Sequence, residues 1–419
     1  MSGLMDSSAR RSWAVLGGLL VLGLALRLVV LPVPGHGGDV SVMSRWAENL
    51  ATWGPFLFYQ HDTAIYPALL PFLWPIGLAI DGDGLRYAIK GISIPFDLLL
   101  GVLLYAVVSN RTDQARGLLA GGLYLLNPAA IIGGPLWGQV DAAGTLFYLA
   151  ALVALAAGQF AGSASLTALA GLSKPQFGLV ALPLAVVTLQ RWRHGHGPRP
   201  LVLAVVGGGV TTLIVCLAFG LSPFRWLELL QDAAARHPET SLGAFNIWAL
   251  LVGFKVPDEP YVGFGGVLLV AGIIGSLIPL RRGSDLATLL AVGLFLAFAF
   301  YFLPTRVHER YLFPALALAA PFAAVDRSSL AAYIAMSVGF ALSLLRVLVE
   351  TTNFRTYVEL DALLVSDIMV WVIGLTLIGS ALTLIRLTLS GAGDPLNERD
   401  VAPARGPAAE PDPASAAPG

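Results

Sequence analysis

The sequence predicts an all-α, polytopic membrane protein with about twelve membrane helices, some of them short or broken. Two observations predict this class. Hydrophobic residues make up 56% of the 419 residues and charged residues only 12%, which is about half the share in soluble domains. Apolar runs also recur along the whole length. The only cysteine, Cys216, lies inside one of these runs, which excludes a disulfide framework, and the formal net charge of −1 does not suggest a nucleic-acid partner.

The apolar runs set the expected helices. The first run follows Arg10 and Arg11 and has no small-residue cleavage signal after it, so we expect a retained helix and not a signal peptide. The expected helices span residues 13–31, 89–109, 116–128, 142–158, 162–173, 177–190, 200–220, 262–280, 286–303, 311–325, 330–347 and 364–388. Residues 163–189 could form one long helix or two short ones broken at "SKPQ". A lysine followed by a proline at this depth favours two.

Charge placement predicts the topology. With residues 1–12 in the cytoplasm and a break at "SKPQ", the short cytoplasmic segments hold ten arginines and only four acids. This asymmetry is the one that the positive-inside rule describes. The membrane domain then covers residues 13–389, with external loops at 32–88 and 221–261. Residues 390–419 contain six prolines and no apolar periodicity, so we expect a disordered cytoplasmic tail.

The first external loop carries a candidate catalytic carboxylate, Asp39. Downstream of it, Met43, Trp46, Leu50 and Trp53 recur at helical spacing, which is typical of a helix that lies in the membrane interface. Asp39 could be the N-cap of this helix, or it could contact a sugar hydroxyl at the membrane surface. The two roles are compatible, because a cap fixes the position of the carboxylate.

A second external stretch, "PTRVHERYLFP", gathers cations in front of an apolar helix. Arg306, His308 and Arg310, together with Lys174 of "SKPQ", are candidates for binding a phosphate group. If a helix begins near Thr305, the two arginines share a face beside an anion-favouring helix terminus. The alternative is that these residues only anchor lipid headgroups and that a neighbouring glutamate pairs with one of them.

The stretch "WGQVD" supplies candidate sugar contacts, because flat aromatic faces with amide and carboxylate partners commonly hold sugars. Alternatively, its tryptophan belongs to an interfacial belt and its aspartate caps the next helix. The candidate residues for sugar or acceptor binding are Arg45, Trp46, Tyr66, Trp137, Gln139, Asp141, Asn246 and Trp248. The external loops contain no convincing metal-ligand spacing, so neither a metal nor another cofactor is expected.

The order of five motifs carries a family resemblance. The segments "GGD…RW", "YP", "NPA…PLWGQVDA", "KPQ" and "TRVHERYLFP" follow one another along the chain. In this the chain resembles the C-class membrane glycosyltransferases, which use polyprenyl-phosphate sugars as donors. It is most similar to bacterial mannosyltransferases that resemble the enzyme adding the second mannose to GPI anchors. The resemblance covers about residues 10–390. Dolichol-linked glucosyltransferases have "HEK" where this chain has "HERY", so the cation there is Arg310.

The resemblance implies a reaction. A hexose, with mannose expected, would pass with inversion from a polyprenyl-phosphate donor to a hydroxyl of a lipid-linked or glycan acceptor, on the external (periplasmic) face of the plasma or inner membrane. Asp39 would act as the general base, and Lys174, Arg306, His308 and Arg310 would hold the phosphate. Two other functions stay open. One is a flippase or transporter of lipid-linked sugars, and the other is a polymerase or ligase of surface glycans.

Overall fold

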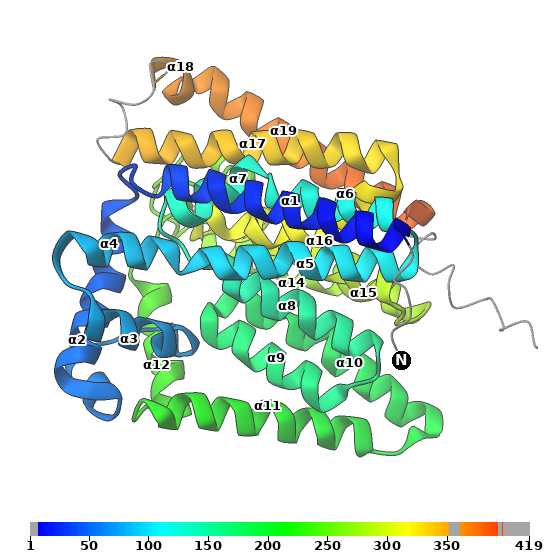
Figure 1. The fold of residues 1–419 in the computed structure, drawn as a ribbon, viewed down its shortest axis with the longest axis horizontal. Coiled ribbons are helices and arrows are strands. Elements are labelled where there is room, and N and C mark those ends of the chain that lie inside the picture. The colour runs from blue at the N-terminus through cyan, green and yellow to red at the C-terminus, as the bar shows by residue number, and fades with distance from the viewer. Residues whose placement is uncertain (1–6, 352–360, 393–395, 397–419) are drawn as a thin grey trace, which may run out of the picture.

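A computed structural model describes residues 7–351, 361–392 and 396, and it confirms the all-α class (Figure 1). The helices that build the membrane domain are α1 (Ser7–Val30), α5 (Ser93–Arg111), α6 (Gln114–Leu125), α8 (Asp141–Ala156), α9 (Phe160–Ser173), α10 (Ala181–Arg191), α11 (Arg199–Ala218), α14 (Val262–Leu277), α15 (Leu286–Phe302), α16 (Phe313–Val325), α17 (Arg327–Thr351) and α19 (Asp367–Leu387). Each of the twelve apolar ranges predicted to be helical coincides with one of these helices.

Further elements connect these helices. They are α2 (Gly37–His61), η1 (Pro67–Leu69), α3 (Leu70–Ala79), α4 (Gly82–Gly91), α7 (Pro128–Ile131), η2 (Ile132–Leu136), η3 (Pro175–Val180), η4 (Trp192–His196), α12 (Pro223–Ala235), β1 (Ser241–Leu242), α13 (Ile247–Leu251), η5 (Ile278–Arg281), β2 (Val307–His308), η6 (Glu309–Leu312), α18 (Asp361–Val365) and η8 (Thr388–Ala392). Helical backbone therefore enters the predicted tail as far as residue 392. Most of that tail, and residues 1–6, lie outside the described residues.

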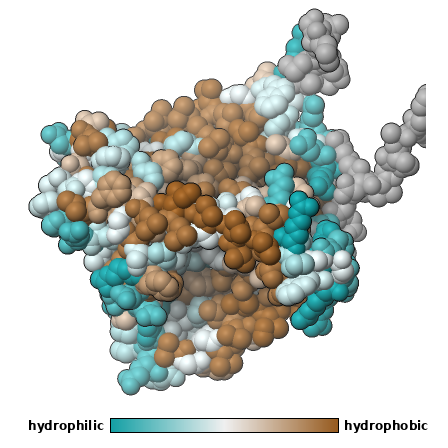
Figure 2. Space-filling model, turned by 90° about the horizontal axis from the view of Figure 1, so that it is seen from below, coloured by the Kyte–Doolittle hydropathy of each residue, from teal (hydrophilic) through white to brown (hydrophobic). Residues whose placement is uncertain are grey.

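The protein is a multi-span membrane protein by the length and composition of its helices. Six helices in the described residues are long and apolar enough to cross a membrane, or up to seven if the pair Gln114–Leu125 and Pro128–Leu136, bent by 43°, forms one span. Further apolar helices of 10–17 residues lie among them. The total of twelve membrane segments stays a prediction. Figure 2 shows an apolar band across the middle of one face, with hydrophilic residues gathered at its two ends.

Burial separates the inner helices from the outer ones. Nearly every residue of α15 and α16 is buried, which matches their lack of charged side chains. Helices α11 and α14 are also strongly apolar but are mostly exposed, and only 11% of the residues in the most apolar stretch of each are buried inside the protein. Apolar residues on an outer surface face lipid in a membrane protein, so these two helices lie at the periphery of the bundle.

The helix break at "SKPQ" is confirmed. Helix α9 ends at Ser173, Lys174 has an extended backbone with φ of −159°, and a 3-10 turn follows before α10 begins. The break places Lys174 at a junction between two short helices, and its ammonium group is oriented into the protein. Irregular backbone at this depth is tolerated because it is buried inside the protein.

Several of the connecting elements cluster at one end of the bundle. In Figure 1, α2, α3, α4 and α12 lie at the end opposite to the N-terminus. At this end the loop after α11 pairs with the loop before α16 through a two-stranded parallel sheet, in which Ser241 faces Val307 and Leu242 faces His308. This pairing fixes the backbone of the "TRVHER" stretch beside α2.

Candidate active site

The site is centred on Asp39 in the first turn of α2. The helix begins at Gly37 and its N-cap is His36, whose Nδ1 accepts a hydrogen bond from the backbone N–H of Asp39 over 3.3 Å. The expectation that Asp39 itself caps the helix is therefore wrong. Because an imidazole caps the helix, the carboxylate of Asp39 is left to make contacts with other segments.

Two side chains from distant segments hold that carboxylate. Trp137 Nε1 donates to Asp39 Oδ2 over 2.7 Å, and Arg310 Nη1 lies 3.8 Å from the same oxygen. The Asp39 side chain keeps 23% of its surface exposed. Burial acts to raise the pKa of Asp39, but the charge of Arg310, the neighbouring His36 imidazole and the hydrogen bond from Trp137 outweigh it and hold the pKa well below its usual value. The carboxylate is therefore ionised at physiological pH.

Trp137 is a structural partner of Asp39 and not an interfacial belt residue. It is almost completely buried, and its ring stacks on His36 at a centroid distance of 5.1 Å and an interplanar angle of 11°. The following Gly138 has φ of +98°, and a Cβ there would lie 2.5 Å from a Val40 side-chain carbon. The sharp turn that brings Trp137 and Gln139 to the site therefore requires glycine.

Lys174, Gln139 and Asp141 form a buried polar group. Lys174 Nζ donates to Gln139 Oε1 over 2.5 Å and to Asp141 Oδ1 over 2.8 Å, and the side chains of Lys174 and Asp141 are each 1% exposed. Asp141 therefore pairs with Lys174, and Val140 is the residue at the cap position of α8. Lys174 also lies 5.7 Å from the centre of the Tyr66 ring. Asp141 Oδ2 is buried and has no hydrogen-bond partner among the described residues.

The backbone of the "TRVHER" stretch is not α-helical, and its last two residues, Glu309 and Arg310, begin the 3-10 turn η6. Arg306 has φ of +63°, β2 follows it, and α16 begins only at Phe313. The prediction that Arg306 and Arg310 share a helix face is therefore wrong, because strand pairing with β1 replaces the first helical turn. Arg306 instead forms a two-pronged ion pair with Asp258, at 2.7 Å from Nε and 3.1 Å from Nη2.

Arg310 lies at the centre of the charged contacts. Its Nη1 donates to Glu309 Oε1 over 2.7 Å, as well as lying near Asp39. Its Nε is buried and has no hydrogen-bond partner among the described residues. Burial raises the pKa of Glu309, although Arg310 acts against this shift. Burial, reinforced by the charge of Arg310, lowers the pKa of His308 well below its usual value, so this imidazole is neutral at physiological pH.

These residues together form what we call the Asp39 cluster. Its members are His36, Asp39, Tyr66, Trp137, Gln139, Asp141, Lys174, His308, Glu309, Arg310 and Tyr311. The charges of Lys174, Arg310 and Asp39 are close enough to act on one another. Tyr311 was not among the predicted site residues, and its ring lies 6.0 Å from the Arg310 guanidinium.

Other predicted contact residues lie outside the cluster. Asn246 caps α13 and donates to the carbonyl of Pro304, while Trp248 donates to the carbonyl of Leu303. Trp46 packs edge-on against Tyr66, with 5.7 Å between the ring centroids, so it helps to fix the position of a cluster residue. Arg45 is half exposed and pairs with Asp62 at 3.2 Å.

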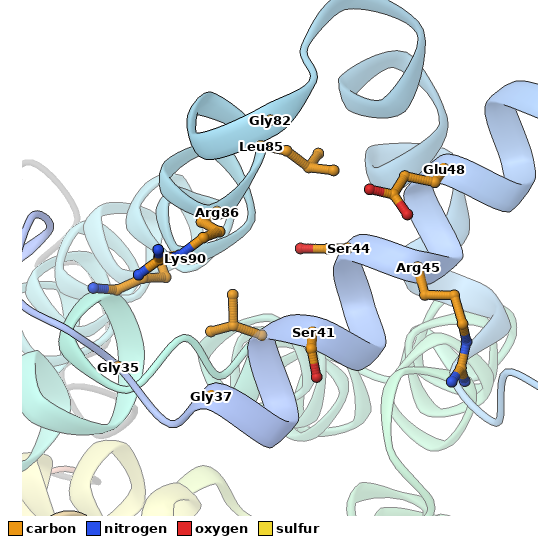
Figure 3. A pocket seen from close by; sticks show the side chains of 11 residues that line it. Gly35, Gly37, Ser41, Ser44, Arg45, Glu48, Gly82, Leu85, Arg86 and Lys90 are labelled. Carbon is orange, nitrogen blue, oxygen red and sulfur yellow. The ribbon is translucent and has the colours of Figure 1, made fainter. Parts of the chain in front are cut away.

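A polar pocket of about 380 Å³ lies beside the cluster, between α2 and α4. Figure 3 shows Ser44 and Glu48 directed from α2 toward Leu85 of α4 across this pocket. Ser44 Oγ is buried and has no hydrogen-bond partner among the described residues. Arg45, which was predicted to contact sugar or acceptor, also lines the pocket. The pocket and Asp39 therefore share α2.

Comparison with known proteins identifies no family for this chain. No family model matches the chain. No curated protein matches it. Among solved structures, the chain is similar to the apo oligosaccharyltransferase of Archaeoglobus fulgidus, with a TM-score of 0.45 and 14% identity over 92% of this chain and 56% of that one.

Two other solved structures are similar. One is ArnT from Cupriavidus metallidurans in the apo state, with a TM-score of 0.49 and 16% identity over 93% of this chain and 78% of that one. The other is the arabinosyltransferase EmbB from Mycobacterium smegmatis, with a TM-score of 0.40 and 17% identity over 95% of this chain and 42% of that one. The chain thus spans little more than half of the oligosaccharyltransferase and less than half of EmbB. The similarity is loose and concerns the fold alone.

Proposed function

We propose that the protein transfers a hexose, with mannose as the first candidate, from a polyprenyl-phosphate donor to a hydroxyl of a lipid-linked or glycan acceptor on the external face of the membrane. One observation carries the proposal. Asp39 is an ionised, partly exposed carboxylate held beside the buried guanidinium of Arg310, which has an unpaired N–H. Such a transfer needs a base that accepts the proton of the acceptor hydroxyl and, next to it, a cation that binds the departing phosphate.

In the proposed step, the acceptor oxygen attacks the anomeric carbon while the bond from that carbon to the phosphate oxygen breaks. The acceptor proton passes to Asp39, and the bonding electrons leave with the polyprenyl phosphate. A carboxylate of low pKa is a weak base. It suffices here, because glycosyl transfer goes through an oxocarbenium-like transition state and the attacking oxygen becomes strongly acidic only as its new bond forms.

The other cluster residues have supporting roles in this proposal. The free N–H of Arg310 binds a phosphate oxygen, and the neutral His308 donates one N–H to it. Lys174 acts through its positive charge and keeps Gln139 and Asp141 in place for sugar hydroxyls. Arg306 is engaged by Asp258, so in this proposal it secures the loop and does not contact the donor.

The pocket between α2 and α4 is proposed to hold the polar part of the acceptor. Its Ser44 hydroxyl and Glu48 carboxylate suit sugar hydroxyls, which both donate and accept hydrogen bonds. Ser44→Ala and Glu48→Gln should raise the KM for the acceptor at least several-fold and leave the KM for the donor unchanged. A change confined to the donor KM would remove this pocket from the acceptor path.

The decisive experiment follows the fate of a labelled sugar. Purified protein is incubated with a panel of polyprenyl-phosphate sugars radiolabelled in the sugar, together with membrane lipid and glycan extracts as acceptors. We expect label to leave the lipid phosphate and enter a new product with wild type and not with Asp39→Asn. Asp83→Asn, which changes an exposed aspartate of the same loop, is the matched control.

The same assay separates the alternatives. A flippase would move labelled lipid across proteoliposome membranes without breaking the sugar–phosphate bond. A polymerase or ligase would leave lipid-phosphate monosaccharides untouched and consume only lipid-linked oligosaccharides. Normal sugar transfer by Asp39→Asn would show that Asp39 is not the proton acceptor.

A further inference from the structure

A second site lies at the other end of the bundle. In Figure 1, the connection from α10 to α11 is at the end opposite to α2. Gly195 and Gly197 turn the chain there with φ of +85° and +71°. Gln190 Nε2 donates to the carbonyl of Leu280 over 3.1 Å and ties this turn to the end of α14 and η5. Two chain turns far apart in the sequence are thus fixed side by side.

Basic side chains from both turns line one pocket of about 330 Å³. These are Arg191, His194, His196, Arg281 and Arg282, and no carboxylate lines the pocket with them. Within the part of the chain that the structure describes, the three arginines form no ion pair. The aspartate nearest in sequence, Asp285, uses its carboxylate to cap α15 through Thr288, with both contacts at 2.9 Å.

An apolar groove continues from this pocket. It is a second pocket of about 320 Å³ between α10 and α14, and the two pockets share Gln190 and Arg281. Its walls are apolar side chains of the two helices, namely Val186, Leu189, Ile274, Leu277 and Ile278. A further arginine, Arg193, lies along it. The two adjoining pockets together are therefore strongly cationic at one end and lined by apolar side chains at the other.

We propose that this pair of pockets binds one anionic phospholipid, with its phosphate among the arginines and an acyl chain in the groove. Arginine suits phosphate because its planar fork makes paired charge-assisted hydrogen bonds. Basic pockets between membrane helices recruit anionic headgroups in this way. A purely topological role for the arginines requires positive charge in these loops, but it requires neither their convergence on one pocket nor an adjoining groove. The proposal does not depend on sugar transfer.

Native mass spectrometry of the intact protein tests the proposal. The protein is titrated in detergent with phosphatidylglycerol and with phosphatidylcholine of the same acyl chains. We expect one phosphatidylglycerol to bind in preference to phosphatidylcholine. Each arginine at an anionic lipid surface changes affinity about fivefold, so Arg281→Gln/Arg282→Gln should lower the preference roughly 25- to 30-fold. Arg10→Gln/Arg11→Gln removes the same charge from the N-terminal end of α1 and should leave it unchanged.

Two further arms identify the ligand. Dihexanoyl phosphatidylglycerol and inorganic phosphate should bind far more weakly than the long-chain lipid, because neither fills the groove. Leu277→Gln should weaken long-chain binding and leave the short-chain lipid unaffected. Equal loss in the two double-arginine variants, or equal binding of inorganic phosphate and long-chain lipid, would overturn the proposal.

Discussion

The hydrogen bond from Trp137 to Asp39 allows the sharpest test of the active site. Trp137→Phe removes the indole N–H that donates to Asp39 Oδ2 over 2.7 Å. It keeps an aromatic ring that can stack on His36, as the indole does now at 5.1 Å. The carboxylate keeps Arg310 and His36 as partners, so the substitution weakens its environment without leaving it unpaired.

The size of the effect follows from the kind of bond. A hydrogen bond to a charged group contributes about 1.5–3 kcal/mol. If this bond holds Asp39 in the geometry needed for proton transfer, its loss should lower kcat about 10- to 150-fold. Donor affinity should change little, because the hydrogen bond and ring stacking found for Trp137 among the described residues involve Asp39 and His36, not Arg310 or His308.

The pH profile gives an independent readout. Asp39 works as a base only when it is ionised, and its lowered pKa keeps activity constant until the pH falls into the acid range. Trp137 is one of the groups that lower this pKa, so Trp137→Phe should move the acid limb of the profile toward higher pH. The measurement is the rate of sugar release from labelled donor between strongly acidic and neutral pH, because the acid limb lies below the usual aspartate pKa.

A matched control separates this effect from lost packing. Trp226 also donates its indole N–H, to the carbonyl of Ile65 over 3.1 Å, but it lies outside the Asp39 cluster. Trp226→Phe should leave both kcat and the acid limb as in wild type. If Trp137→Phe keeps more than half of the wild-type kcat and its acid limb does not move, Asp39 is not the base or does not depend on this bond.

Three further predictions concern buried charges. Asp141→Asn should lower the free energy of unfolding by about 3–5 kcal/mol, because it leaves the Lys174 charge unpaired, and a second change, Lys174→Met, should recover much of this loss in SDS-titration unfolding. Asp258→Asn should cost about 1.5–3 kcal/mol by releasing Arg306. Because the pKa of Asp258 is lowered in the folded state, the ion pair stabilises the wild type fully at pH values above the usual aspartate pKa, and this stabilisation is lost as the pH falls toward the lowered pKa. The free energy of unfolding should therefore show this loss at acid pH in wild type and not in Asp258→Asn. Glutamine resembles the protonated form of glutamate, which the raised pKa of Glu309 favours, so Glu309→Gln should preserve transfer within about fivefold. In wild type we expect donor-analogue affinity to decline as the pH rises and Glu309 loses its proton, and this decline should be absent in Glu309→Gln. A greater than hundredfold loss of transfer in Glu309→Gln would show that the charge is required.

The sequence predicted the helices well because hydrophobic periodicity and length determine them locally. It also predicted the break at Lys174, since a proline and a buried cation both disfavour a continuous helix. It failed at Arg306, where strand pairing with a segment more than sixty residues earlier overrides the helical pattern. Such pairing leaves no mark in the local sequence. The positive φ of Arg306 has no glycine to signal it.

The partners of the site residues were harder to predict than the residues themselves. Asp39, Trp137, Lys174 and Arg310 were all expected on the external side, and the structure brings them together. Their pairing was not predicted, because it depends on contacts between segments that are far apart in the sequence. The histidine in "GHGGD" was visible in the sequence, but only the backbone geometry shows that it caps α2 in place of Asp39.

The charge balance of the cluster explains why Glu309 matters. Three carboxyl groups, on Asp39, Asp141 and Glu309, face two basic groups, on Lys174 and Arg310, while His308 is neutral. With all three carboxyl groups ionised, a phosphate would enter a region that already carries excess negative charge. Glu309 is the cluster carboxyl outside the membrane helices whose pKa is raised by burial, so under the proposed function we expect it to take up a proton when a phosphate binds. Protonated Glu309 no longer competes for the Arg310 charge, and the guanidinium becomes available to the phosphate. Donor affinity should therefore fall as the pH rises through the pKa of Glu309.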